Sequence, residues 1–125
     1  MTTPSPRAGT ATIRRLRREY LRALEILGAS RDQLHEALAA GASTLSIVRD
    51  HVVQDGDVSD FADLFDPAAL RASLSTALVE FERARHRSQR LLFQLLRAEG
   101  MSASDIARRW GISRQLVSRM INESD

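Results

Sequence analysis

A long helical segment in the second half of the chain constrains the possible folds more than any other feature of the sequence. Its predicted start is Asp66 followed by Pro67, because aspartate caps free N–H groups and proline fits the first helical position. Its predicted end is Glu99, since Gly100 favours a helix stop. A helix with a narrow lengthwise seam must pack along another helix, so we expect an all-α fold. The seam residues recur at steps of four and three: Leu70, Leu74, Ala77, Phe81, Ala84, Ser88, Leu91, Leu95 and Ala98.

Two further helices are predicted upstream of this segment. The first runs from about Thr12 to Leu27 and the second from Arg31 to about Val53, because apolar residues recur at steps of three and four in both. The Gly-Ala-Ser segment 28–30 should separate them, since glycine ends helices and serine caps the next one. The second helix is predicted to pack through Leu34, Leu38, Gly41, Leu45, Val48 and Val52.

The composition excludes several classes of protein. The chain has no cysteine, which rules out disulfides, thiolate metal sites and cysteine nucleophiles. It has no apolar run of about 18 residues, so we expect no membrane span and a cytoplasmic protein. The aspartates around residues 55–63 do not fit a calcium loop, and the scattered histidines match no catalytic or zinc motif. We therefore expect no enzyme, no cofactor and no metal.

The charges are unevenly distributed along the chain. All 18 basic residues are arginine, and the net charge is only +2. Residues 1–31 carry a net charge of +5, residues 32–66 carry −7, and residues 67–125 carry +4. The acidic middle can pair with one of the basic ends or bind a protein partner that has a basic patch.

Two arginine clusters admit two interpretations each. Five arginines of the first helix either grip phosphates or form a solvated face that pairs with the acidic middle. A second cluster in residues 83–90 either contacts phosphate or pairs with nearby acids. The arginines of the first cluster are Arg14, Arg15, Arg17, Arg18 and Arg22.

The last part of the chain, Ser102–Glu123, is predicted to form two short helices joined by a turn. Ser102 and Ser113 suit the two cap positions. Gly111 can adopt the positive φ that a tight turn between helices requires. The end of the long helix should supply the third helix of this unit through Phe93, Leu95 and Leu96. In the second short helix the apolar residues share one arc: Leu116, Val117, Met120 and Ile121.

The opposite arc of this second helix carries Arg114, Gln115, Ser118, Arg119 and Asn122, with no acidic and no large apolar side chain. Arginine donates two hydrogen bonds to guanine, glutamine and asparagine match the adenine edge, and serine can bond to either. We therefore predict that this helix enters the major groove of DNA. The predicted base contacts come from Arg114, Gln115, Ser118 and Arg119.

This segment resembles the helix-turn-helix of bacterial repressors and of the promoter-reading domain of sigma factors. The matching features are small Ala107 in the first helix, Gly111 in the turn, Ile112 after it and Val117 inside the second helix. In such repressors the positions just after the turn read bases, which agrees with the contacts predicted above. We also predict DNA backbone contacts from Ser102, Ser113, Arg108, Arg109 and Asn122, although Arg108 and Arg109 are equally explained as solvated.

Three regions follow from these predictions. Residues 1–11 should form a disordered tail, residues 12–85 a helical body that dimerises, and residues 86–125 the helix-turn-helix unit. We expect a bacterial transcriptional regulator that binds double-stranded DNA as a homodimer. The alternative is an all-helical protein-interaction module in which the helix-turn-helix is a scaffold. A third interpretation is a regulator controlled by a small molecule between the body helices.

Overall fold

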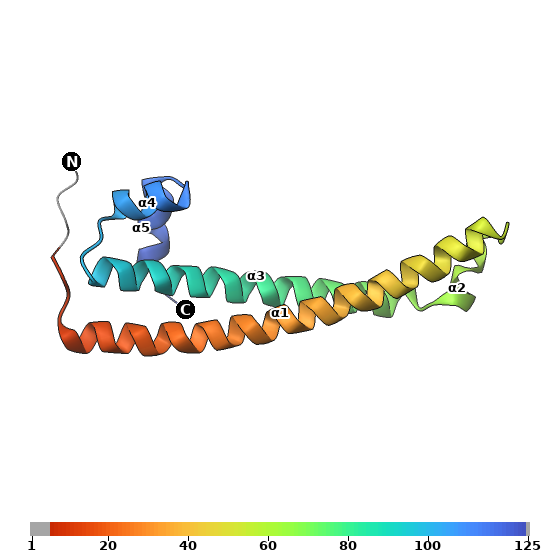
Figure 1. Ribbon diagram of the computed structural model, residues 1–125, viewed down its shortest axis with the longest axis horizontal. Helices are drawn as coiled ribbons and strands as arrows, with labels where there is room; N and C mark the ends of the chain where they lie inside the picture. Colours follow the sequence, from red (N-terminus) through yellow and green to blue (C-terminus); the bar gives the residue numbers. More distant parts are fainter. Residues whose placement is uncertain (1–5, 125) are drawn as a thin grey trace. The chain divides into compact units, whose positions relative to one another are not determined.

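The computed structural model of the protein describes residues 6–124, and every regular element within them is a helix (Figure 1). The predicted all-α class, with a long helix leading into a C-terminal helix-turn-helix, is confirmed. None of the helices in this part of the chain is both long and apolar enough to cross a bilayer. The elements are α1 (Thr10–Val53), the short 3₁₀ helix η1 (Val58–Asp60), α2 (Phe61–Leu64), α3 (Pro67–Ala98), α4 (Ala103–Trp110) and α5 (Arg114–Asn122).

Helix α3 begins and ends within one residue of its predicted bounds. The Asp66 Oδ1 atom accepts a hydrogen bond from the backbone N–H of Ala69 (3.1 Å), as expected for a capping aspartate. At the other end Gly100 adopts φ = 107°, and the N–H of Met101 donates to the carbonyl of Leu96 (2.9 Å). The second half of the predicted seam is closely packed, with buried residues at Ala77, Ala84, Ser88, Leu91, Leu95 and Ala98.

The predicted break at residues 28–30 is wrong, because α1 is continuous from Thr10 to Val53. The seam residues continue in phase through this segment, from half-buried Leu27 to buried Ser30 and half-buried Leu34. A glycine inside a helix costs only about 1 kcal/mol, which the uninterrupted seam on both sides outweighs. Ser30 therefore packs in the seam and does not cap a new helix.

The predicted seam of the second half of α1 is also partly wrong. Leu38, Leu45 and Val52 are 53%, 72% and 46% exposed. The side that faces α3 carries smaller residues, among them buried Ala37 and half-buried Thr44. The larger side chains of Leu38, Leu45 and Val52 therefore lie mostly outside this interface.

The N-terminal tail was predicted to be disordered over residues 1–11, of which residues 1–5 lie outside the described residues. Within the described part, the backbone N–H of Ala8 donates to the carbonyl of Ala98 at the end of α3 (2.7 Å). Helix α1 already begins at Thr10, two residues before the predicted start. Ala8 also packs against the buried cluster that Ile13 and Leu16 form with the end of α3.

The chain divides into two compact units. Unit 1 contains Met1–Leu27 and Ala84–Asp125, and unit 2 contains Gly28–Arg83. On α3 the division falls between Arg83 and Ala84, and the first part of α1 falls in the same unit as α4 and α5.

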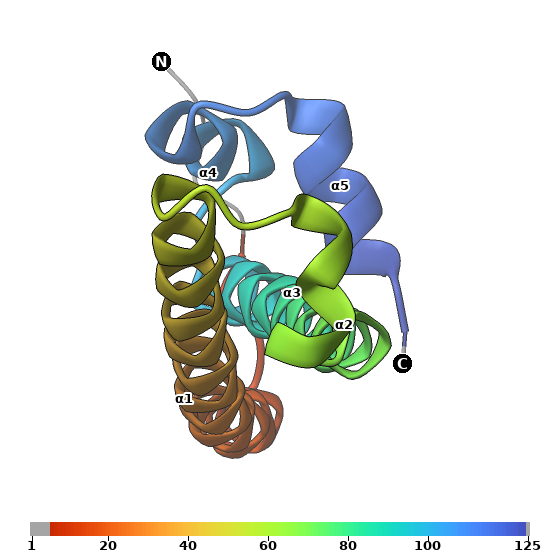
Figure 2. The same cartoon turned by 90° about the vertical axis from the view of Figure 1, so that its right-hand side faces the viewer.

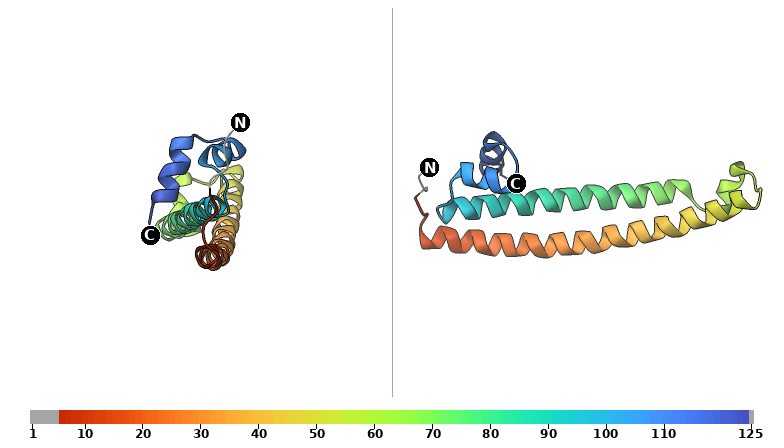
Figure 3. Two further views of the ribbon diagram at one scale, coloured as in Figure 1. Left: turned by 90° about the vertical axis from the view of Figure 1, so that its left-hand side faces the viewer. Right: turned by 45° about the horizontal axis from the view of Figure 1, so that its top comes forward.

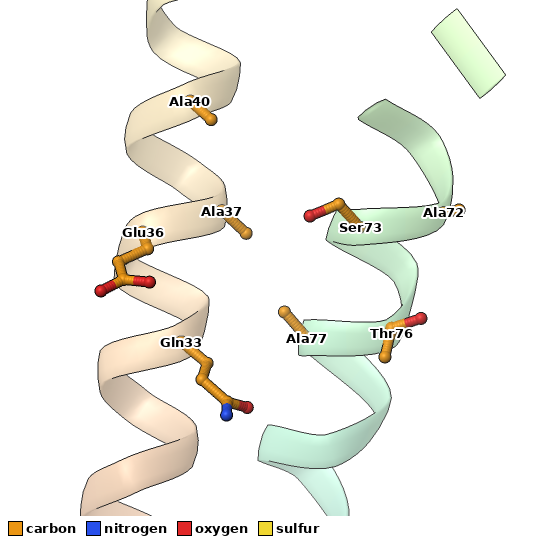
Figure 4. Close-up of a pocket in the computed structure, with 8 residues that line it drawn as sticks. All are labelled: Gln33, Glu36, Ala37, Ala40, Ala72, Ser73, Thr76 and Ala77. Atoms are coloured by element: carbon orange, nitrogen blue, oxygen red, sulfur yellow. The ribbon is translucent and has the colours of Figure 1, made fainter. Parts of the chain in front are cut away.

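Unit 2 is a helical hairpin in which small side chains lie between α1 and α3. Ala37 and Ala77 are buried and face each other across the two helices (Figure 4). They help to line a cavity of about 520 Å³, together with the polar side chains of Gln33, Ser73 and Thr76. The buried residues of unit 2 are therefore small, whereas larger ones such as Leu34, Leu74 and Phe81 are half-buried.

The connection from α1 to α3 lies at one end of unit 2 and includes η1 and α2 (Figure 2). A turn follows α1, and Asp55 in it has a positive φ of 62°. His51 Nε2 lies 2.9 Å from the carbonyl oxygen of Asp57. A Cβ atom added at Gly56 would clash with this imidazole unless the His51 side chain moved. Phe61, which follows in this connection, is 44% exposed.

Candidate nucleic-acid interface

Two serine caps and one glycine set the geometry of α4 and α5. The Ser102 side chain accepts a hydrogen bond from the N–H of Asp105 (3.1 Å), and the Ser113 side chain accepts one from the N–H of Leu116 (3.1 Å). Between the helices Gly111 adopts the left-handed conformation with φ = 67° and ψ = 34°. The N–H of Ile112 then donates to the carbonyl of Ala107 (3.1 Å), which closes α4. These bonds fix the turn between the two helices.

The core of this segment holds α5 against α4 and the end of α3. Phe93 of α3, Ile106 of α4 and Val117 of α5 are all fully buried, and Ala107 is the small residue between the two short helices. The Phe93 ring meets Trp110 edge to face, with 5.2 Å between ring centroids. The predicted roles of Ala107, Gly111 and Val117 in packing and turning are confirmed, and the C-terminal segment is a helix-turn-helix.

The predicted third helix of this unit is also present, with one correction. Phe93 and Leu96 of α3 pack against α4 and α5. Leu95 does not, because it points to the other side of α3 and packs with Ile13 and Leu16 of α1. Residues 93 and 95 are two apart on a helix and face different directions, so one surface cannot use both.

The end of α5 is anchored to α3 by polar contacts that the sequence did not reveal. Gln94 Nε2 donates to the carbonyl oxygens of Ile121 (2.9 Å) and Glu123 (3.3 Å). The Arg90 guanidinium, only 5% exposed, donates to the same Glu123 carbonyl (3.3 Å). His86 Nε2 lies 2.7 Å from the Glu123 carboxylate. In the cluster at residues 83–90, Arg90 and His86 are therefore used in part to position α5.

The polar arc of α5 lies on the surface. Arg114, Gln115, Arg119 and Asn122 are exposed, and Ser118 is half-buried. Neither Arg114 nor Arg119 forms an ion pair or side-chain hydrogen bond within residues 6–124. The opposite arc is buried through Val117 and Met120. The helix thus presents the side chains that were predicted to contact bases.

The residues predicted to contact the DNA backbone differ in how available they are. Ser102 is only 7% exposed and already caps α4, so its predicted phosphate contact is not supported by its position. Ser113 is exposed at the start of α5, next to free N–H groups of the first turn. Arg108 forms an ion pair with Asp105 on the surface, whereas Arg109 is exposed and makes no such pair within the described residues.

The two units have opposite charge. Unit 1, which contains α4 and α5, has fourteen arginines and six acidic residues, a net charge of +8. Unit 2 has four arginines and ten acidic residues, a net charge of −6. The small net charge of the whole chain therefore hides a strongly basic unit around the helix-turn-helix, which is the electrostatic condition for binding a phosphate backbone.

Comparison with known proteins supports this assignment for the C-terminal segment. Residues 89–123, which include the end of α3 and all of α4 and α5, match the model of the MarR family. This family consists of winged helix-turn-helix DNA-binding proteins. The matched segment is helical and contains no wing strands. No curated protein and no solved structure matches the chain.

Proposed function

We propose that this protein is a transcriptional regulator that binds double-stranded DNA sequence-specifically, as a homodimer, with α5 in the major groove. The observation that carries the proposal is the exposed polar arc of α5, which has two arginines without intramolecular partners in residues 6–124. The similarity of residues 89–123 to the MarR family and the net charge of +8 on unit 1 support it.

The side chains of α5 divide into two roles under this proposal. Arg114 and Arg119 can each donate a pair of hydrogen bonds to guanine, and Gln115 can pair with adenine. Ser118 is half-buried, so its short side chain can contact only a base that approaches α5 closely. Ser113, with the free N–H groups at the start of α5, is placed to bind a phosphate beside the groove. Arg108, Arg109 and Asn122 are exposed and can add further backbone contacts.

The proposed homodimer uses the exposed apolar side of unit 2. We call Leu38, Leu45 and Val52 the leucine face of unit 2; they lie seven residues apart on α1 and are all more than 40% exposed. Leu38 and Leu45 also line an apolar cavity of about 470 Å³ together with Phe65, Leu70 and Leu74. A second copy packed on this face would cover large apolar side chains that are otherwise in water. A two-fold dimer would bind two half-sites about 34 Å apart.

Selection of bound sequences from a random duplex pool tests the proposal. We expect an enriched palindrome whose two halves are separated by about one helical turn. The double variant Arg114→Gln, Arg119→Gln should lose the enrichment while its circular dichroism spectrum stays that of the wild type, because both side chains are exposed. A pool that shows no enrichment with the wild-type protein would contradict sequence-specific binding.

The alternative is that the helix-turn-helix serves as a scaffold for a protein partner. The acidic charge of unit 2 is compatible with a basic partner, but no contact within residues 6–124 identifies one. Titration of an arbitrary duplex separates the two functions. Helix-turn-helix regulators bind nonspecific DNA with dissociation constants of about 10⁻⁴–10⁻⁶ M, whereas a scaffold should show no binding in this range.

A further inference from the structure

The N-terminal half of α1 carries a second basic surface in unit 1. Arg14, Arg18 and Arg22 follow at steps of four residues, so their side chains line up about 6 Å apart along the helix. Arg15 and Arg17 flank this line, and we call the five residues the arginine row. All five are exposed, and none makes a side-chain hydrogen bond or ion pair within residues 6–124.

Most of the arginine row faces away from α3. Ile13 and Leu16 of α1 pack against Leu95 and Ala98 of α3, and Arg14 and Arg18 lie on the opposite side of α1. Arg15 lies at the edge of the row that is nearer to α3, where it lines a cavity with Arg90 and Gln94. The helix-turn-helix packs against the other side of α3, through Phe93. Within unit 1, α3 therefore lies between the first part of α1 and the pair α4 and α5 (Figures 1 and 3). A duplex on the polar arc of α5 would therefore have α3 between it and Arg14 and Arg18.

The acidic groups near the arginine row lie at its edge toward α3 or beyond its end. Glu19 is half-buried and lines a cavity with Arg15, Arg90 and Glu123. Glu25 is exposed beyond the end of the row, one turn after Arg22. The segment 10–27 thus has five arginines and two glutamates, a net charge of +3 on five turns of helix.

From this geometry we infer that the arginine row binds the phosphates of a second DNA duplex, so that unit 1 can bridge two duplexes. The inference rests on the proposed function, because the first duplex is held by α5. Phosphates are regularly spaced along a duplex. A line of guanidinium groups about 6 Å apart can therefore contact several phosphates of one duplex. Contacts to phosphates carry no sequence information, so this second contact is independent of sequence.

A bead assay measures bridging directly. A duplex of arbitrary sequence of about 30 base pairs, close to three helical turns, is fixed on beads, and the same duplex with a fluorophore is added in solution. The wild-type full-length protein should retain fluorescence on the beads at low salt. Because both contacts use phosphates, retention should fall steeply as salt is raised.

Two variants and one control identify the surface responsible. The triple variant Arg14→Gln, Arg18→Gln, Arg22→Gln should reduce bridging about tenfold or more and lower its salt slope by about 2.7, the value for three phosphate contacts. Its binding to a single duplex through α5, measured by anisotropy on the sequence obtained by selection, should stay within about twofold of the wild type. The control Arg49→Gln, Arg71→Gln, Arg83→Gln removes the same charge from exposed positions of unit 2 and should leave bridging unchanged.

Three outcomes would overturn the inference. Bridging that persists in the triple variant and disappears in the Arg114→Gln, Arg119→Gln variant would mean that two copies of α5 in a dimer hold the two duplexes. A large loss of single-duplex affinity in the triple variant would place the arginine row on the same duplex as α5. If the triple variant bridged duplexes as the wild type does but lost binding to phosphatidylserine vesicles, the arginine row would be assigned to a lipid surface. If selection enriched no sequence, the proposed function of α5 would be contradicted. The bridging measurement would still test the arginine row, because it uses a duplex of arbitrary sequence.

Discussion

Units 1 and 2 are built from the same two long helices, yet their interiors and surfaces are opposites. Unit 1 buries large side chains such as Phe93, Ile106 and Val117, and its surface is basic. Unit 2 buries Ala37 and Ala77 and leaves Leu38 and Leu45 exposed, while its surface is acidic. In unit 1, large buried side chains hold α5 in a fixed position. Under the proposed function, the exposed apolar side chains of unit 2 are the surface on which a second copy binds.

The largest effect should come from emptying the core of unit 1. Phe93→Ala removes a fully buried ring that contacts α4, α5 and Trp110, so the free energy of unfolding should fall by about 3–5 kcal/mol. Urea denaturation followed by circular dichroism measures this. The matched change in unit 2, Leu45→Ala at a position 72% exposed, should alter the free energy by less than about 0.5 kcal/mol in the monomer. Equal losses would refute the difference between the two interiors.

Glycine substitutions should have opposite signs in the two units. Gly111 has φ = 67°, so Gly111→Ala forces a left-handed alanine and should destabilise the protein by about 1–2 kcal/mol. Gly28 lies inside α1, and a Cβ atom there would meet no other atom within 4 Å, so Gly28→Ala should stabilise the protein by about 0.5–1 kcal/mol. Thermal denaturation of both variants checks the signs. A destabilising Gly28→Ala would argue that α1 is interrupted there after all.

The two serine caps separate stability from DNA binding. Ser102→Ala and Ser113→Ala each remove a cap and should each cost about 1 kcal/mol of stability. Only Ser113→Ala should also weaken DNA binding, because Ser113 is exposed at the start of α5 and Ser102 is buried. Denaturation and anisotropy titrations on the same two proteins give both quantities. Equal losses of affinity would show that the exposure of the serine does not decide its role.

The substitution Leu45→Gln should change the stability of the monomer least, but it should weaken the association of the homodimer. Leu45→Gln lies in the leucine face of unit 2 and should leave monomer stability within about 0.5 kcal/mol. It should raise the dissociation constant of the homodimer at least about tenfold, because a leucine side chain that would be buried twice in a two-fold interface is lost. Sedimentation at several concentrations measures the constant. Leu21→Gln, at an exposed leucine of unit 1, is the control, and an equal effect there would place the interface elsewhere.

The fold could be predicted where local signals and packing agree. Asp66 with Pro67, and Ser102, Ser113 and Gly111, mark helix ends that the structure confirms because each makes the expected cap or turn. The break at residues 28–30 was predicted from similar local signals, but a seam in phase on both sides overrides them. Leu38 and Leu45 were placed in the interface because they are hydrophobic, whereas the structure places smaller residues such as Ala37 there.

In the candidate site, too, some features could be predicted from the sequence pattern, whereas others depend on packing. The exposure of Arg114, Gln115 and Arg119 follows from the apolar arc on the other side of α5, so periodicity was sufficient. The anchoring of α5 by Gln94 and Arg90 could not be predicted, because their partners are backbone carbonyls about thirty residues away in sequence.

The most direct test of the central claim is an anisotropy titration of Arg114→Ala against the selected duplex and against duplexes with single base changes. If the exposed arc of α5 reads bases, Arg114→Ala should lose about 1–3 kcal/mol of binding free energy and should no longer distinguish bases at one position of each half-site. Affinity and base preference equal to those of the wild type would contradict the account.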